Sequence, residues 1–172
     1  MTKQSFEFVG QNFAMACEQY GHVDRVSILQ FLGGATGYHI QSVLQDKGIH
    51  QITIDTRRPS RTCTTVLCKS SGQMTELIEP SSRVPLESRD YLENLILNIV
   101  ESNQHLECIA LCGSLPPGIT GSTYTHIANA KPDGVLLFLD ACQELDVLKT
   151  GKVPLFSQNP SYPNSDISRL IF

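Results

Sequence analysis

Short, strongly apolar runs alternate along this chain with segments whose apolar residues recur every three or four positions. The strand-like runs are residues 24–32, 49–55, 107–112, 134–140 and 153–156. The helical segments are residues 12–20, 38–48, 85–102, 122–130 and 143–149. This alternation predicts an α/β fold, with a mostly parallel sheet flanked by helices.

Glycines mark the places where these segments stop. Gly21 and Gly48 follow the first two helical segments, where glycine commonly ends a helix. The run Gly33-Gly34-Ala35-Thr36-Gly37 is expected to form a flexible turn between the first strand and the second helix.

Two extended runs do not fit the parallel pattern. Residues 62–68 and 74–78 are rich in Thr, Val and Leu, and the polar segment 69–73 between them reads as a hairpin turn. They predict a small antiparallel addition to the sheet. Two prolines and several turn formers lie within 160–165, so residues 161–172 are expected to form a loosely ordered tail.

Composition limits the possible partners. The chain has 172 residues, of which 41% are hydrophobic, and a net charge of −4, which fits one globular domain without a basic field for nucleic acid. No apolar run approaches the roughly 20 residues that cross a bilayer, and no signal-type stretch follows Met1. We expect a cytoplasmic, soluble protein with no nucleic-acid or membrane partner.

The cysteines and histidines do not form a recognisable metal or disulfide pattern. No C-x-x-C pair occurs among the six cysteines, and no two histidines have helical i, i+4 spacing. Most of the cysteines lie in apolar runs, so reduced, buried thiols are expected and no metal site is predicted.

The run Gly113-Ser114-Leu115-Pro116-Pro117-Gly118 directly follows a predicted strand. Open α/β sheets bind ligands at the carboxyl ends of their strands, so this loop is a candidate binding element. Its glycines permit close backbone approach, and Ser114 offers a hydroxyl. A tight strand-to-helix connection with no ligand is the alternative that the pattern leaves open.

Several motifs in order resemble the PfkB (ribokinase-like) carbohydrate kinases. The matching segments are G-Q-N-F-A from Gly10, F-L-G-G-A-T-G from Phe31, S-R-T-C-T from Ser60, T-E-L-I-E-P from Thr75 and G-S-L-P-P-G from Gly113. The doubled proline and Arg61 are most similar to the branch of 1-phosphofructokinases and tagatose-6-phosphate kinases. The resemblance implies a partial ribokinase-like fold over residues 1–160, with lid-type strands at about 52–80.

The resemblance also implies roles for individual residues. Gly10 and Asn12 would contact the sugar, although a Gly-Asn helix start is the alternative. Arg61 would bind the phosphate of a sugar phosphate, for which a planar guanidinium is suited, although a solvated strand-edge arginine is the alternative. Ser114 would lie against the substrate. Asp140 ends a strand, where acidic residues are common, and receives no role.

Departures from the family pattern concern the catalytic parts. Family members begin with a strand bearing a sugar-binding Asp and a G-G-K-G turn, where this chain has residues 5–9 (S-F-E-F-V). Of the family's Lys-x-Asn-x-x-Glu pattern, which helps to organise ATP and Mg²⁺, only Asn159 remains. No Gly-rich anion hole with a catalytic Asp occurs in the 172 residues, so no catalytic residue is assigned.

These observations give two functional expectations. The first is a PfkB-type, ATP-dependent kinase of a sugar or sugar phosphate, a ketohexose phosphate being favoured, represented here by a chain truncated at both ends and inactive alone. The second is a non-catalytic sugar-phosphate-binding protein that forms a homo-oligomer or pairs with an intact kinase. Unpaired sheet edges would favour such pairing.

Overall fold

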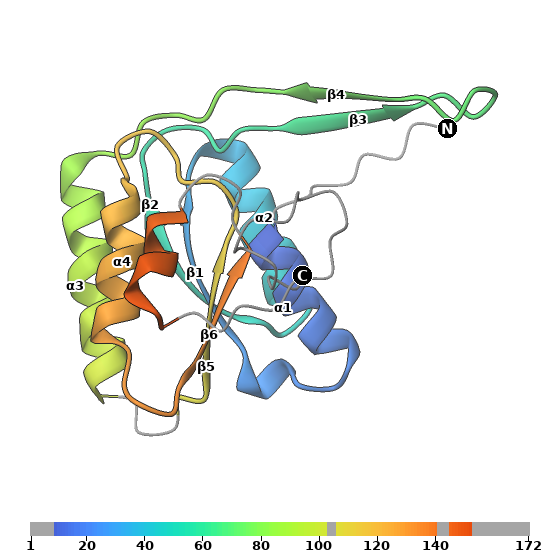
Figure 1. The fold of residues 1–172 in the computed structure, drawn as a ribbon. Coiled ribbons are helices and arrows are strands. Elements are labelled where there is room, and N and C mark those ends of the chain that lie inside the picture. Colours follow the sequence, from blue (N-terminus) through green and yellow to red (C-terminus); the bar gives the residue numbers. More distant parts are fainter. Residues whose placement is uncertain (1–8, 103–105, 141–144, 153–172) are drawn as a thin grey trace. The chain divides into compact units, whose positions relative to one another are not determined.

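The structure is a computed structural model that describes residues 9–102, 106–140 and 145–152 (Figure 1). The chain divides into two compact units, residues 1–88 and 89–172, each of which is described by itself. Helices and strands alternate in both units, as the sequence predicts.

The first unit is built around a parallel pair of strands. Its elements are helix α1 (Val9–Gln19), the short 3-10 helix η1 (Val23–Arg25), strand β1 (Ser27–Leu32), helix α2 (Gly34–Asp46), strand β2 (His50–Asp55) and strands β3 (Cys63–Leu67) and β4 (Met74–Ile78). Strands β1 and β2 pair in parallel, with Ser27 opposite His50. The buried core of this unit consists of Ala14, Ile28, Leu32, Ile40, Leu44 and Ile49.

Helix α2 begins earlier than the sequence predicts. The expected flexible turn at residues 33–37 is wrong, because Gly34 to Gly37 form the first turn of this helix and the Gly37 amide donates to the Gly33 carbonyl at 3.2 Å. Gly34 begins the helix with a φ of +66°, a conformation that glycine adopts without strain. The predicted stop at Gly48 is confirmed by its φ of +71°.

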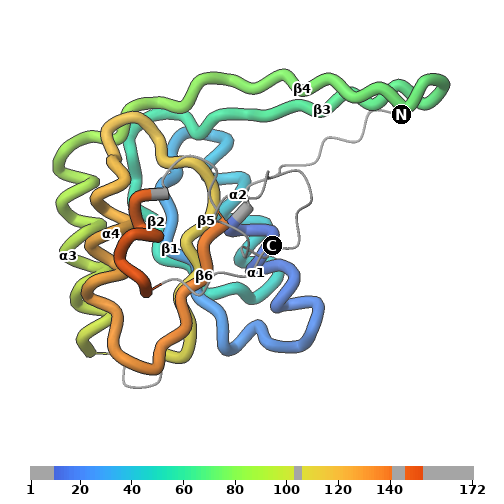
Figure 2. The backbone as a smooth tube through the Cα atoms, viewed as in Figure 1, coloured from blue at the N-terminus to red at the C-terminus, as the bar shows by residue number. Residues whose placement is uncertain are grey.

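Strands β3 and β4 form the predicted antiparallel hairpin, with Cys63 opposite Ile78 and Leu67 opposite Met74. The Cys68 amide donates to the Gln73 carbonyl at 2.8 Å and closes the turn. Figure 2 shows the hairpin as an extended two-stranded arm. Every residue of β4 is exposed, so neither face of the arm is covered within the described part of the chain.

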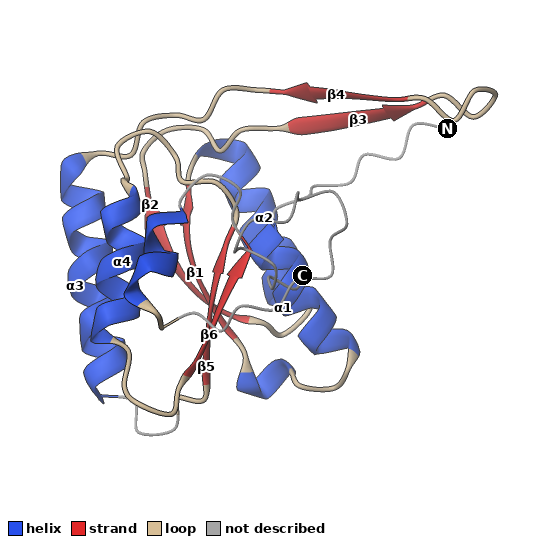
Figure 3. Ribbon diagram, in the orientation of Figure 1, coloured by secondary structure: helices blue, strands red, loops and turns tan. Residues whose placement is uncertain are grey.

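The second unit repeats the strand–helix–strand plan. It contains most of helix α3 (Leu86–Ser102), strand β5 (Cys108–Cys112), helix α4 (Gly121–Ala130), strand β6 (Leu136–Asp140) and the 3-10 helix η2 (Leu145–Thr150) (Figure 3). Strands β5 and β6 pair in parallel, with Cys108 opposite Leu136. The buried core consists of Leu111, Tyr124, Ile127, Ala128, Leu137, Leu139 and Val147.

Three other details differ from the predicted elements. Residues 23–25, predicted to begin a strand, form η1 instead, and the Arg25 amide donates to the His22 carbonyl at 3.1 Å. The predicted helix at 143–149 is a 3-10 helix where it is described. The five described cysteines are free thiols, but none is buried and Cys68 is exposed, so their predicted burial is wrong. The predicted strand at 153–156 and the tail lie outside the described residues.

Candidate functional site

The loop that carries Arg61 is held at the carboxyl end of β1 by hydrogen bonds. The Ser60 amide donates to the Gly33 carbonyl at 2.8 Å, and the Gly33 amide donates to Ser60 Oγ at 3.0 Å. Nearby, the Thr56 amide donates to the Leu32 carbonyl at 2.9 Å. The segment between β2 and β3 is therefore held against the end of the parallel pair, the usual place for a ligand in an open α/β sheet.

Glycine is required at position 33 by the close approach of this loop. A Cβ atom on Gly33 would lie 2.3 Å from the Arg58 carbonyl oxygen and 2.8 Å from Thr56 Oγ1. The first of these atoms belongs to the backbone, so no side-chain rotation could relieve the contact. The Thr56 side chain is buried, and its hydroxyl donates to the same Arg58 carbonyl at 3.0 Å.

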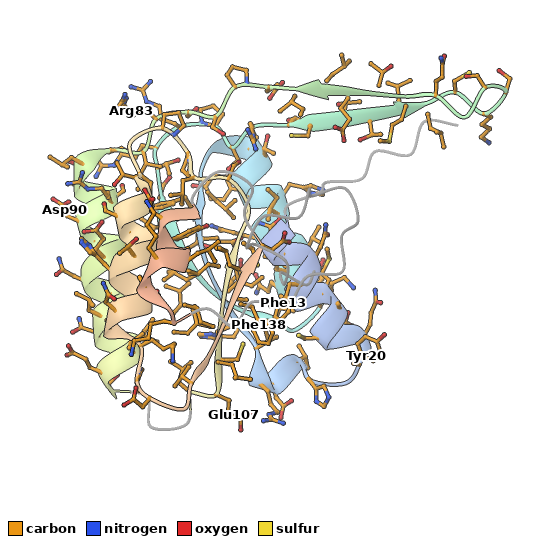
Figure 4. All side chains as sticks on the ribbon, viewed as in Figure 1. Phe13, Tyr20, Arg83, Asp90, Glu107 and Phe138 are labelled. Atoms are coloured by element: carbon orange, nitrogen blue, oxygen red, sulfur yellow. The ribbon has the colours of Figure 1, made fainter. Side chains whose placement is uncertain are left out.

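Arginines gather in the two connections at this edge of the first unit. Arg57, Arg58 and Arg61 lie between β2 and β3. Arg83, which Figure 4 labels, lies between β4 and α3. Ser82 Oγ donates to the Pro59 carbonyl at 3.1 Å and links the two connections. Such a group of guanidinium side chains favours an anionic ligand.

Arg57 has a carboxylate partner. Arg57 Nη1 lies 3.5 Å from Glu87 Oε1, with both side chains largely exposed. Exposed ion pairs contribute about 0–1 kcal/mol, so this pair does little to fix the loop. Arg57 also has a φ of +54°, and its amide donates to Asp55 Oδ1 at 2.8 Å.

The predicted sugar contacts Gly10 and Asn12 lie in the first turn of α1, which begins three residues earlier than expected. Asn12 is exposed. Between them, the buried Gln11 donates through Nε2 to Gln30 Oε1 on β1 at 2.7 Å. Gln30 Nε2 in turn lies 3.3 Å from Thr53 Oγ1 on β2.

This row of polar side chains joins α1 to both parallel strands, and our sequence analysis missed it. The available signal was a glutamine within an otherwise apolar strand, at position 30. A buried amide requires partners, so a polar residue in such a run predicts a hydrogen-bonded neighbour on the covering helix.

The loop of residues 113–118 has the predicted place in the second unit, directly after β5. Gly113 has a φ of +82°, and its amide donates to the carbonyl of Asp140 at 2.7 Å. The Tyr124 hydroxyl on α4 lies 3.3 Å from the Cys112 carbonyl. Ser114 is exposed immediately after these anchored residues. The loop is thus fastened to both strands and to the following helix.

The thiol at the end of β5 is in an unfavourable environment for its anion. Burial, with the nearby charges of Asp140 and Cys108, raises the pKa of Cys112 to about 11. The group is therefore a neutral thiol near pH 7 and a poor nucleophile.

Four of the five predicted site residues are described. Gly10 and Asn12 share one turn of α1, Arg61 immediately precedes the hairpin, and Ser114 follows β5 in the second unit. Asn159 lies outside the described residues.

Among the described residues, no group of three or more His, Cys, Asp or Glu side chains could hold a metal ion. Within the same ranges, no helix combines the length and hydropathy needed to span a bilayer.

A separate cavity of about 320 Å³ lies at the amino ends of β5 and β6. It is lined by Val100, Glu101, Leu106, Pro132, Asp133, Gly134 and Val135. None of the predicted site residues lines it.

Comparison with known proteins finds similarity to sugar-phosphate kinases, although no protein-family model matches the chain. It is 28% identical over 133 residues to tagatose-6-phosphate kinase from Staphylococcus epidermidis, covering 77% of this chain and 41% of that protein. It is also 28% identical over 140 residues to ATP-dependent 6-phosphofructokinase isozyme 2 from Escherichia coli, covering 80% of this chain and 44% of that protein.

Comparison with solved structures also finds similarity to a sugar-phosphate kinase. The crystal structure of Escherichia coli phosphofructokinase-2 in complex with fructose-6-phosphate matches with a TM-score of 0.67 and 25% identity, over 80% of this chain and 44% of that one. The chain spans less than half the length of the curated relatives it matches. It is homologous over most of its own length to sugar-phosphate kinases of the PfkB family, and its α/β fold is a partial ribokinase-like fold.

Proposed function

We propose that this chain is the sugar-phosphate-binding part of a PfkB-type kinase that transfers phosphate from ATP to a ketohexose phosphate. The observation that carries the proposal is the fastened loop with its arginines at the carboxyl end of the β1–β2 pair. The homologous tagatose-6-phosphate kinase and the fructose-6-phosphate complex of phosphofructokinase-2 favour a phosphorylated ketohexose.

Arg61 is the proposed ligand of the substrate phosphate. Its guanidinium can donate two parallel hydrogen bonds to phosphate oxygens. Its side chain is half-buried beside an anchored backbone, and this limits the entropy lost when it binds. Phosphate recognition by Arg61 would orient the sugar for reaction at its free hydroxyl.

Gly10, Asn12 and Ser114 are the proposed contacts to the sugar. The exposed amide of Asn12 can both donate to and accept from hydroxyl groups. Gly10 allows the sugar to approach the backbone, and the exposed Ser114 hydroxyl lies at a strand end. Asn159 is the proposed contact on the nucleotide side.

The chemical step needs a base for the sugar hydroxyl and groups that neutralise the transferring phosphoryl group. ATP and Mg²⁺ would supply the phosphoryl group and part of the charge neutralisation in the whole kinase. No Gly-rich anion cradle with an adjacent Asp occurs in the 172 residues, so we propose that this chain binds sugar phosphate but does not phosphorylate it alone.

The test combines binding with catalysis on the purified 172-residue chain. Calorimetric titration with fructose 6-phosphate and tagatose 6-phosphate should show binding, and Arg61→Ala should weaken it by roughly tenfold or more, since a hydrogen bond to a charged group contributes about 1.5–3 kcal/mol. Arg25→Ala is the matched control, because Arg25 precedes β1 at the amino end of the pair and should leave the affinity unchanged. A coupled assay with ATP and Mg²⁺ should detect no turnover.

Each result bears on a different part of the proposal. Equal affinity of the parent chain and Arg61→Ala would contradict the role of Arg61. Turnover by the purified chain would show that a base is present and would overturn the proposed inactivity.

A second candidate function is a non-catalytic protein that binds sugar phosphate and associates with itself or with an intact kinase. The exposed apolar side chains of the β3–β4 hairpin favour it, since Leu67, Met74 and Ile78 are each about 60% exposed. Co-elution of the chain with an intact kinase as a discrete complex would support this function, and a monomer that binds no sugar phosphate would contradict it.

A further inference from the structure

The backbone on both sides of Arg61 is held by hydrogen bonds to residues distant in sequence. Before it, Ser60 exchanges two hydrogen bonds with Gly33, one of them through Ser60 Oγ. After it, the Thr62 amide donates to Glu79 Oε2 at 2.8 Å, and the Glu79 amide donates to the Thr62 carbonyl at 3.1 Å. Arg61 is therefore the single residue between two reciprocal hydrogen-bonded pairs.

These two pairs constrain the main chain from which the guanidinium extends. The first joins Ser60 to the end of β1, and the second joins Thr62 to the residue that follows β4. With both neighbours fastened, the Arg61 backbone has little freedom left. Phosphate binding then does not have to order the main chain, and preorganisation of this kind increases affinity by lowering the entropy lost on binding.

In each pair, a side-chain oxygen accepts a hydrogen bond from a backbone amide. Ser60 Oγ accepts from Gly33, and Glu79 Oε2 accepts from Thr62. Glu79 lies opposite Thr62, one residue along the pairing from Arg61, and its negative charge alone would oppose an anionic ligand. Its role as an acceptor for the Thr62 amide accounts for a carboxylate at this position.

We infer that Ser60 and Glu79 are positioning residues that hold Arg61 for the phosphate of the substrate. The inference rests on the proposed role of Arg61 in binding that phosphate. It assigns to Ser60 and Glu79 no contact with the substrate, so their effects should reach the ligand only through Arg61.

The experiment compares fructose 6-phosphate with fructose, which lacks the phosphate. The ratio of the two affinities isolates the phosphate interaction, because a general loss of structure would weaken both ligands alike. We expect Ser60→Ala and Glu79→Ala each to lower this ratio by about fivefold, the usual effect of one lost hydrogen bond. Ser60→Thr and Glu79→Gln retain an acceptor oxygen and should restore the ratio. Ser102→Ala, which removes a hydroxyl bonded to Asn98 on α3, is the matched control and should leave it unchanged.

Amide hydrogen exchange reports the two pairs without any ligand. Ser60→Ala should accelerate exchange at Gly33, and Glu79→Ala should accelerate exchange at Thr62, with each conservative variant restoring protection. Unchanged exchange at both amides would overturn the assigned hydrogen-bond roles.

The binding outcomes separate this inference from the proposed function. If Arg61→Ala lowers the affinity ratio but Ser60→Ala and Glu79→Ala do not, the positioning roles are overturned and the role of Arg61 stands. If the parent chain does not prefer fructose 6-phosphate to fructose, the proposed phosphate site fails and the positioning roles fail with it. The inference is supported if Ser60→Ala and Glu79→Ala lower the affinity ratio and the conservative variants restore it.

Discussion

Two cysteines of this chain have opposite chemical environments. Cys68 lies exposed in the hairpin turn, and hydrogen bonds, above all that from the Ser70 side chain and then those from Ser71, lower its pKa to about 6. Burial beside Asp140 and Cys108 raises the pKa of Cys112 to about 11. Our sequence analysis did not separate the two, because Cys68 and Cys112 both end apolar runs and the hydrogen bonds and burial that set their pKa values arise in the folded chain.

We expect alkylation by iodoacetamide at pH 7 to label Cys68 well before Cys112. Cys68 should react fast because it is mostly thiolate at this pH, and the thiolate is the nucleophile. Cys112 is protonated and should react slowly. Mass spectrometry of timed samples measures both rates. Ser70→Ala removes the largest cause of the lowered pKa, so it should shift the pH profile of Cys68 labelling upward. A profile unaffected by Ser70→Ala would contradict the assigned cause.

The raised pKa of Cys112 also gives a direction for stability against pH. The folded thiol has a pKa of about 11 and the unfolded thiol a value near 9.0, so the unfolded state loses its proton first. The contribution of the neutral Cys112 thiol to the stability of the folded state is fully present below pH 9 and decreases as pH rises toward 11. Denaturant unfolding of the parent and Cys112→Ala across this range should show a smaller alkaline loss in the variant.

Strand β6 shows how one element divides its side chains between core and solvent. Leu137 is fully buried, whereas its neighbour Leu136 is 53% exposed. Leu137→Ala should lower the free energy of unfolding by about 2–5 kcal/mol, because it leaves a cavity in the core of the second unit. Leu136→Ala is the matched control and should cost well under half as much. Urea unfolding followed by circular dichroism measures both free energies. An equal decrease in the two variants would contradict the placement of Leu137 in the core and Leu136 toward solvent.

At the level of elements, apolar runs and helical spacing were sufficient to predict the four helices, the parallel strands and the hairpin within four residues of their ends. The turn expected at residues 33–37 was wrong because glycine signals both turns and close contacts. Here the contact of Gly33 with Arg58 and the positive φ of Gly34 explain the glycines, and the helix still forms. Such contacts between distant segments leave no local signal.

The candidate site could be predicted only in part. Ser114 lies in the loop after β5, as expected, because strand and loop order are local properties of the sequence, and Arg61 lies just before β3. The fastening of Arg61 by Gly33 and Glu79 could not be predicted, since it depends on residues that come together only in the folded chain. The roles of the predicted site residues stay predictions.

For the molecule as a whole, the uncovered hairpin is the feature that bears on assembly. Leu67, Met74 and Ile78 lie on one face of it, because Leu67 opposes Met74 and Ile78 opposes Cys63. We expect this face to pair with a second copy of the chain. Leu67→Lys with Ile78→Lys should lower the molar mass measured by light scattering toward that of a monomer. Leu86→Lys changes an equally exposed leucine outside the hairpin and should leave the molar mass unchanged. A parent chain that is already monomeric would contradict the expectation.

The parallel pairs join residues that are near one another in the chain. Ser27 pairs with His50, and Cys108 pairs with Leu136, so each pair is closed by one helix and its short connections. Short loops cost little entropy to close, and domains commonly fold from the N-terminus during synthesis. We therefore expect the β1–β2 pair to form before the loop of Arg61 is added to it, since that loop is held by residues on both this pair and the later strand β4.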